Sequence, residues 1–122
     1  MKITLCGSTK FKDQFEEWNR RLSKEGHIVY SVSAYGHSGD TLTDSEKEIL
    51  DLVHLRKIVE SDAIFVVGLR PDPIFLDEAP RILYIGDSTR REIAWAKLLG
   101  KAVYKLDDEA PKGFREEFHA EI

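Results

Sequence analysis

Apolar positions recur with two different periods along this chain, and the periods predict its first elements. The segment from Lys2 to Cys6 alternates like a strand, and positions 11, 15, 18 and 22 then carry large apolar side chains at helical spacing. A second strand is predicted from His27 to Val32. A strand, a helix and a strand in this order form a β-α-β unit, whose two strands we expect to be parallel.

A second unit follows the same plan. Asp44 to Glu60 is predicted to be a helix, opened by a cap at Thr43 or Asp44, and Ala63 to Val67 is a nearly continuous apolar run. Such a run is typical of a central parallel strand that is covered on both faces. The apolar face of the helix is wider than one contact with a sheet requires, and it comprises Ile49, Leu52, Val53, Leu55, Ile58 and Val59. We therefore expect a homodimer or higher homo-oligomer.

A third unit, Tyr84 to Leu106, combines a tight turn, a helix and a short strand. Gly86 permits a sharp bend, the three residues after it are of the helix-capping type, and Gly100 closes the helix. Together the units predict an α/β fold, a three-layer α/β/α sandwich with a mostly parallel, flavodoxin-like or Rossmann-like sheet of four or five strands. Residues 1–122 are expected to form a single domain, because this length supports one core.

Two segments are less regular. Gly68 to Leu83 contains three prolines, which disfavour a long helix, and we expect it to pack as a flap over the end of the sheet or against a partner. Lys112 to Ile122 is predicted to form a short terminal helix, with Phe114 and Phe118 on one face.

Composition and charge narrow the classes of function. Hydrophobic residues at 42% and charged residues at 33% fit an ordinary globular protein. The chain has 18 basic and 22 acidic residues, a formal charge of −4, which is poorly suited to binding a nucleic acid polymer. No secretory or membrane-spanning segment is recognisable. We expect a cytoplasmic protein that binds a small molecule and has no membrane partner.

The single cysteine, Cys6, lies inside the first predicted strand. One cysteine excludes an internal disulfide and a cluster of thiolates around zinc. His27, His37 and His54 show no ligand spacing. The sequence therefore predicts neither a metal nor a cofactor.

The turn after the first strand is a candidate substrate-binding segment, because open α/β sheets bind ligands at the carboxyl ends of their strands. Gly7 permits a close approach of the backbone, Ser8 offers a hydroxyl at a helix start, and Lys10 could meet a phosphate, with Phe11 beside it. A glycine turn with a serine cap also opens many helices that bind nothing. The loop 33–43, with Tyr35, His37 and Asp40, is a further source of ligand contacts.

Glu92 has two interpretations. Close to a helix start, a carboxylate beside unpaired backbone N–H groups is expected to be ionised and aimed at the mouth of the turn, which makes Glu92 a candidate nucleophile. Thr89 and Glu92 also have the spacing of a capping box, in which the glutamate side chain bonds back to the helix start and does no chemistry.

In three stretches the chain resembles the nucleoside 2-deoxyribosyltransferase family, including its branch of 2-deoxynucleoside 5-phosphate N-hydrolases. The stretches are an apolar strand ending in CGS, the run HLRKIVESDAIFVV and the run REIAWAKLLGK. The resemblance covers most of the chain and implies a compact parallel sheet between helices. It also implies cleavage or transfer at the N-glycosidic bond of a (deoxy)nucleoside or (deoxy)nucleotide, with Glu92 as the nucleophile.

Two places depart from the family pattern. The family's second catalytic carboxylate corresponds to His54, so the proton donor is expected to be His54, or Asp51 one turn earlier. The serine of the family's glycine-rich turn is replaced by Gly86, and we assign substrate binding to Gly86, Asp87 and Ser88. A non-catalytic nucleotide-binding or sensor domain on the same fold remains the alternative function.

Overall fold

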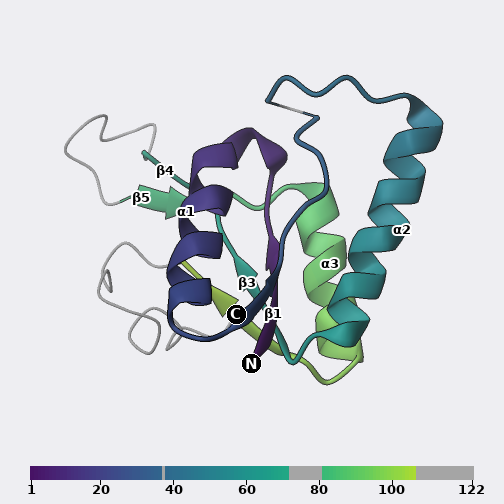
Figure 1. Ribbon diagram of the computed structural model, residues 1–122. Helices are drawn as coiled ribbons and strands as arrows, with labels where there is room; N and C mark the ends of the chain where they lie inside the picture. Colours follow the sequence, from purple (N-terminus) through teal and green to yellow (C-terminus); the bar gives the residue numbers. More distant parts are fainter. Residues whose placement is uncertain (37, 72–80, 107–122) are drawn as a thin grey trace.

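The computed structural model describes residues 1–36, 38–71 and 81–106, and its centre is a sheet of four parallel strands (Figure 1). The strand order is β2-β1-β3-β6. In the sheet, Ile3 of β1 pairs with Val29 of β2 and Ala63 of β3, and Ala63 pairs with Ala102 of β6. The bounds are β1 Lys2–Cys6, β2 Ile28–Tyr30, β3 Ala63–Val66 and β6 Ala102–Lys105.

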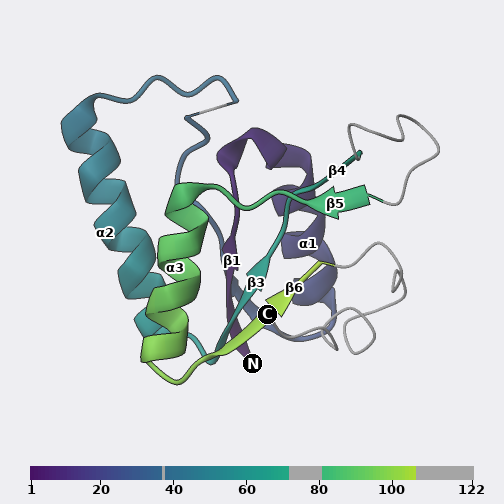
Figure 2. The same cartoon turned by 180° about the vertical axis from the view of Figure 1, so that it is seen from behind.

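Helices cover both faces of this sheet. A short 3-10 turn, η1 (Thr9–Phe11), leads into α1 (Lys12–Lys24), which lies on one face. The other face is covered by α2 (Asp44–Glu60) and α3 (Asp87–Leu98), as Figures 1 and 2 show from opposite sides. The predicted three-layer α/β/α sandwich is confirmed. Among the described residues, no helix has the length and apolar character needed to cross a membrane.

The alternation in β1 explains the two halves of the core. Ile3 and Leu5 point to the α1 side, where they pack with the buried Phe15, Trp18 and Leu22. Cys6 points to the opposite side, into a cluster that α2 and α3 complete with Ile58, Ile93 and Ala96. Because both central strands are covered on both faces, β3 is entirely apolar, and the polar residues of β1 are Lys2 and the buried Thr4.

An antiparallel hairpin, β4 (Leu69–Pro71) and β5 (Arg81–Leu83), extends the end of β3. Gln14 of α1 holds the start of this hairpin, because its Oε1 accepts the backbone N–H groups of Gly68 and Leu69 at 2.9 Å each. Its Nε2 donates to the Leu69 carbonyl at 2.8 Å. The predicted flap 68–83 thus begins and ends as a hairpin; its middle and the predicted terminal helix lie outside the described residues.

The second strand is shorter than the predicted 27–32 because a side chain of α2 binds the backbone carbonyl that follows Tyr30. Lys57 Nζ donates to the Ser31 carbonyl at 2.7 Å and to Ser33 Oγ at 2.9 Å, so the chain leaves the sheet after Tyr30. The third strand ends at Val66 and the last at Lys105, each one residue earlier than predicted.

Helices α2 and α3 begin in different ways. Thr43 caps α2 in a reciprocal capping box: its Oγ1 accepts the Glu46 N–H at 3.1 Å, and Glu46 Oε1 accepts the Thr43 N–H at 2.9 Å. The N-cap of α3 is Gly86, which has no side chain to contribute. The capping box between Thr89 and Glu92, and caps from residues 87–89, are therefore wrong predictions, since these residues already lie inside the helix.

Candidate functional site

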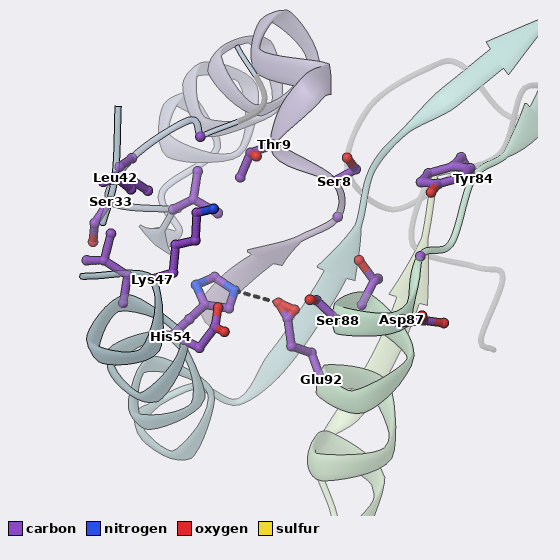
Figure 3. Close-up of a pocket in the computed structure, with 18 residues that line it drawn as sticks. Ser8, Thr9, Ser33, Leu42, Lys47, His54, Tyr84, Asp87, Ser88 and Glu92 are labelled. Carbon is purple, nitrogen blue, oxygen red and sulfur yellow. Dashed lines mark ion pairs between the residues drawn. The ribbon is translucent and has the colours of Figure 1, made fainter. Parts of the chain in front are cut away.

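A cavity of about 390 Å³ opens at the carboxyl edge of the sheet (Figure 3). Strand order reverses there, because β1 connects to β2 on one side while β3 lies on its other side. This crevice is where open α/β sheets hold their ligands. Its walls are the turn after β1, the loop after β2, the first half of α2 and the turn that leads into α3.

His54 of α2 and Glu92 of α3 face each other at this cavity, as the dashed line in Figure 3 marks. His54 Nε2 lies 3.4 Å from Glu92 Oε1, and the side chains are only 10% and 15% exposed. The second carboxylate oxygen of Glu92, Oε2, is buried and has no hydrogen-bond partner among the described residues. A buried polar atom without a partner is costly, so this oxygen is available to a ligand.

One contact between the two helices fixes the separation of this pair. The indole N–H of Trp95 donates to the Leu55 carbonyl at 3.1 Å. Leu55 follows His54 directly, and Trp95 lies about one turn after Glu92 in α3. Any sliding of α3 along α2 would therefore break this bond.

Burial decides the charge of Glu92. Loss of hydration raises the pKa of Glu92 to about 8; the nearby Asp51 carboxylate adds to this rise, and Arg91 opposes it. The expectation that the helix start keeps Glu92 ionised is wrong, because desolvation outweighs the helix dipole here. The carboxyl group is mostly protonated at neutral pH.

Burial also decides the charge of His54. It lowers the pKa of His54 to about 4; Lys57 lowers this pKa further, and a hydrogen bond to the Leu5 backbone acts in the opposite direction. Since Nε2 faces Glu92 and Cys6, we assign the Leu5 bond to Nδ1–H. Neutral His54 then presents the lone pair of Nε2 to Glu92 and can accept its proton.

Cys6 lies next to the same nitrogen. Its Sγ is 3.5 Å from His54 Nε2, and the side chain is fully buried. Burial raises the pKa of the Cys6 thiol, and Glu92 raises it further. The ligand atoms of Cys6, His54 and Glu92 all lie within 4.8 Å of one another.

The other predicted binding residues divide into two groups. Gly7, Ser8, Gly86, Asp87 and Ser88 line the cavity. Lys10 and Phe11 are not among its lining residues, because both pack on the Tyr84 ring. Lys10 Nζ lies 3.8 Å from the centre of that ring, and the Phe11 ring centre lies 6.1 Å from it.

Gly7 and Ser8 also have structural roles. Gly7 has a φ of +147°, and a Cβ there would lie 2.5 Å from the Val67 carbonyl oxygen. Only glycine fits this close approach of the backbone. Ser8 is the N-cap of η1, and its Oγ accepts the Lys10 N–H at 3.4 Å.

Several lining residues were not predicted. Lys47 is one of them; it shares a face of α2 with the predicted Asp51 and His54 at i, i+4 and i+7, a spacing from which it could have been found. Tyr84 has no comparable signal in the sequence. The loop 33–43 contributes Ser33, Ala34, Gly36 and Leu42 instead of its expected side chains.

The expected side chains of that loop are used elsewhere or lie outside the described residues. The Tyr35 ring packs edge-on against Phe15, with ring centres 6.0 Å apart. Asp40 Oδ2 accepts the Tyr35 N–H at 2.6 Å and so closes the loop on itself. His37 lies outside the described residues.

Comparisons with known proteins agree with this fold. A solved structure of a 2-deoxyribosyltransferase from the psychrotolerant bacterium Bacillus psychrosaccharolyticus matches with a TM-score of 0.60 and 18% identity, over 87% of this chain and 72% of that one. No protein-family model matches the chain, and no curated protein matches it in sequence. The resemblance to the nucleoside 2-deoxyribosyltransferase family is thus confirmed at the level of the fold.

Proposed function

We propose that this protein cleaves or exchanges the N-glycosidic bond of a (deoxy)nucleoside or (deoxy)nucleotide. The observation that carries the proposal is the buried pair of His54 and Glu92 at the switch point of a 2-deoxyribosyltransferase-like fold. Breaking an N-glycosidic bond needs a group that attacks the sugar carbon and a group that protonates the leaving base. A protonated carboxyl beside a neutral imidazole can supply both: the carboxylate formed when the proton moves to the imidazole attacks the sugar carbon, and the protonated imidazole protonates the base.

In the first half of the reaction, Glu92 gives its proton to His54 Nε2, and its carboxylate attacks the anomeric carbon. The bond from that carbon to the base nitrogen breaks, an ester forms with Glu92, and the departing base takes the proton from His54. The products are the glycosyl ester and a neutral base. No net charge enters or leaves the buried site, which removes the cost of a lone charge there.

In the second half, water or another base attacks the same carbon from the open side of the cavity. The ester bond breaks, the attacking group loses a proton, and Glu92 recovers that proton through His54. Water gives hydrolysis, and a second base gives transfer. The balance between them depends on how well the closed cavity excludes water.

Asp51 has a different place in this scheme. Its side chain is exposed at the edge of the cavity, one turn before the buried His54 on α2. The Asp51 carboxylate raises the pKa of Glu92, whereas His54 faces Glu92 directly, with Nε2 3.4 Å from Glu92 Oε1. We therefore assign the proton transfer to His54.

The test is release of free base from a panel of nucleosides, deoxynucleosides and their 5-phosphates, followed by chromatography. Glu92→Ala is expected to lower the rate by at least about 10³-fold, because it removes both the nucleophile and the proton. Glu60→Ala is the matched control, since Glu60 is an exposed glutamate at the far end of α2. Its rate should equal that of the wild type.

The alternative function makes a different prediction. A sensor domain would be stabilised thermally by nucleotides and would release no base from any of them. Base release at the wild-type rate by Glu92→Ala would show that the assignment of the nucleophile is wrong.

A further inference from the structure

We propose that Cys6, His54 and Glu92 form a binding site for a zinc ion, which holds the proposed enzyme in an inhibited state. The inhibition rests on the proposed function, whereas the binding of the ion does not. The three side chains come from the end of β1, from α2 and from α3. They meet where the buried core borders the cavity.

The distances between the donor atoms fit a tetrahedral ion. Zinc binds cysteine sulfur at about 2.3 Å and histidine nitrogen or carboxylate oxygen at about 2.0–2.2 Å, so its ligand atoms lie roughly 3.3–3.7 Å apart. His54 Nε2 is 3.5 Å from Cys6 Sγ and 3.4 Å from Glu92 Oε1. The remaining pair also lies within 4.8 Å, so a small change in the Glu92 side chain completes the triangle.

The donor types select the ion. A thiolate, an imidazole and a carboxylate together suit zinc, whereas magnesium and calcium prefer oxygen ligands alone. Three protein ligands leave a fourth position open, and two of the three ligands, His54 and Glu92, line the cavity. The hydrogen bond between His54 and the Leu5 backbone orients the imidazole, as metal-binding histidines usually require.

An unsatisfied atom points to the same site. Glu92 Oε2 is buried without a hydrogen-bond partner among the described residues, although its neighbour Oε1 faces His54. A cation between the two helices would interact with this carboxylate and remove the cost of the unpaired oxygen. When zinc binds, the Cys6 thiol and the Glu92 carboxyl each release a proton to solvent, because only their anions are ligands.

The bound ion would block the proposed reaction in two ways. It occupies the carboxylate that must attack the sugar, and it occupies the nitrogen of His54 that must carry the proton. Binding of the ion and cleavage of the substrate therefore exclude each other. The protein would respond to the supply of zinc without a separate regulatory domain.

Titration with Co²⁺ tests the binding directly. Tetrahedral Co²⁺ on a thiolate gives intense visible bands and a sulfur-to-metal charge-transfer band, and Cys6 is the only cysteine of the chain. We expect these bands in the wild type, their displacement by Zn²⁺, and no charge-transfer band in Cys6→Ala or Cys6→Ser. His54→Gln should weaken Co²⁺ binding by at least about tenfold. Circular dichroism checks that each variant is folded.

His27→Gln is the matched control. His27 Nδ1 lies 2.9 Å from the N-terminal nitrogen, so this pair could bind a metal ion unspecifically. The cobalt bands should survive in His27→Gln. Absence of a charge-transfer band in the wild type, or an unchanged affinity in His54→Gln, would overturn the proposed zinc site.

The inhibition is measured on base release. Zn²⁺ should stop the wild-type reaction, a chelator should restore it, and the inhibition constant should rise at least about tenfold in Cys6→Ala, relative to that variant's own metal-free rate. The two proposals can fail separately. Cobalt bands without base release in metal-free protein would disprove the function alone, and base release that zinc does not affect would disprove the inhibition alone.

Discussion

His54 Nε2 lies 3.4 Å from Glu92 Oε1, and at neutral pH the two side chains form a neutral pair rather than an ion pair. Burial is the main cause on both sides, since it raises the pKa of the carboxyl group and lowers that of the imidazole. The pair holds one proton that can move between its members. Much of the expected chemistry of the site follows from the position of this proton.

The rate of base release should depend on pH as a bell. The active form of the metal-free protein needs protonated Glu92, with a pKa of about 8, and neutral His54, with a pKa of about 4. We expect kcat/KM to be highest between these values and to fall about tenfold per pH unit beyond them. A rate that keeps rising above pH 8 would mean that ionised Glu92 is the resting nucleophile.

Glu92 should destabilise the fold as pH rises. Its pKa of about 8 lies above the unfolded value, so between about pH 4.5 and 8 the folded state binds more protons than the unfolded state and loses stability. Glu92→Gln removes this loss. The difference in the free energy of unfolding between Glu92→Gln and the wild type should therefore shift in favour of the variant by about 1.4 kcal/mol for each pH unit of rise in this window.

His54 changes the stability of the fold with pH in the opposite direction to Glu92. Its lowered pKa adds stability between about pH 4 and 6.5, which offsets the loss from Glu92 there. Urea unfolding from pH 5 to 9 should therefore show a fall of about 2 kcal/mol between pH 6.5 and 8 in the wild type. If Glu92→Gln shows the same fall, Glu92 does not carry a raised pKa.

The turn after β1 should tolerate no side chain. In Gly7→Ala the new Cβ would meet the Val67 carbonyl oxygen at 2.5 Å, in addition to the strain of a positive φ. We expect a loss of about 3 kcal/mol in the free energy of unfolding. Gly26→Ala is the control, because Gly26 has a φ of +94° but nothing within 4 Å of its Cβ, and it should lose about 1 kcal/mol.

Helix α2 should mediate self-association. Ile49, Leu52 and Val59 are 59%, 63% and 45% exposed, although the helix is otherwise packed against α3 and the sheet. We expect light scattering to show a dimer at micromolar concentration and Leu52→Glu to shift it to a monomer. Ile28→Glu, on the edge strand β2, is the control and should remain dimeric. A wild-type monomer would contradict the prediction.

The elements were predictable because their signals are local. The apolar run of β3, the helix from Asp44 to Glu60 and the strand from Lys2 to Cys6 follow from side-chain period and from turn residues. The hairpin of β4 and β5 was not predicted. It depends on Gln14, a residue more than fifty positions earlier, and no local pattern carries that information.

The site was predictable only in part. The same T-x-x-E spacing occurs at Thr43 to Glu46 and at Thr89 to Glu92, yet only the first pair forms a capping box. The difference lies in the surroundings: Glu46 is exposed to solvent, whereas Glu92 is drawn into the cavity opposite His54. Likewise, the pKa of Glu92 is raised mainly because segments distant in the sequence bury it. The residues next to Glu92 in the sequence do not reveal this burial.

The pairing of Ile3 with Ala63 has a consequence for biosynthesis. While the ribosome makes the first half of the chain, β1 has only the edge strand β2 beside it, and its face with Cys6 lacks the side chains of α2 and α3 that cover it in the complete fold. The emerging N-terminal segment therefore exposes apolar surface to solvent until the later segments are made. Slower translation of residues 30–60 should thus increase its capture by chaperones.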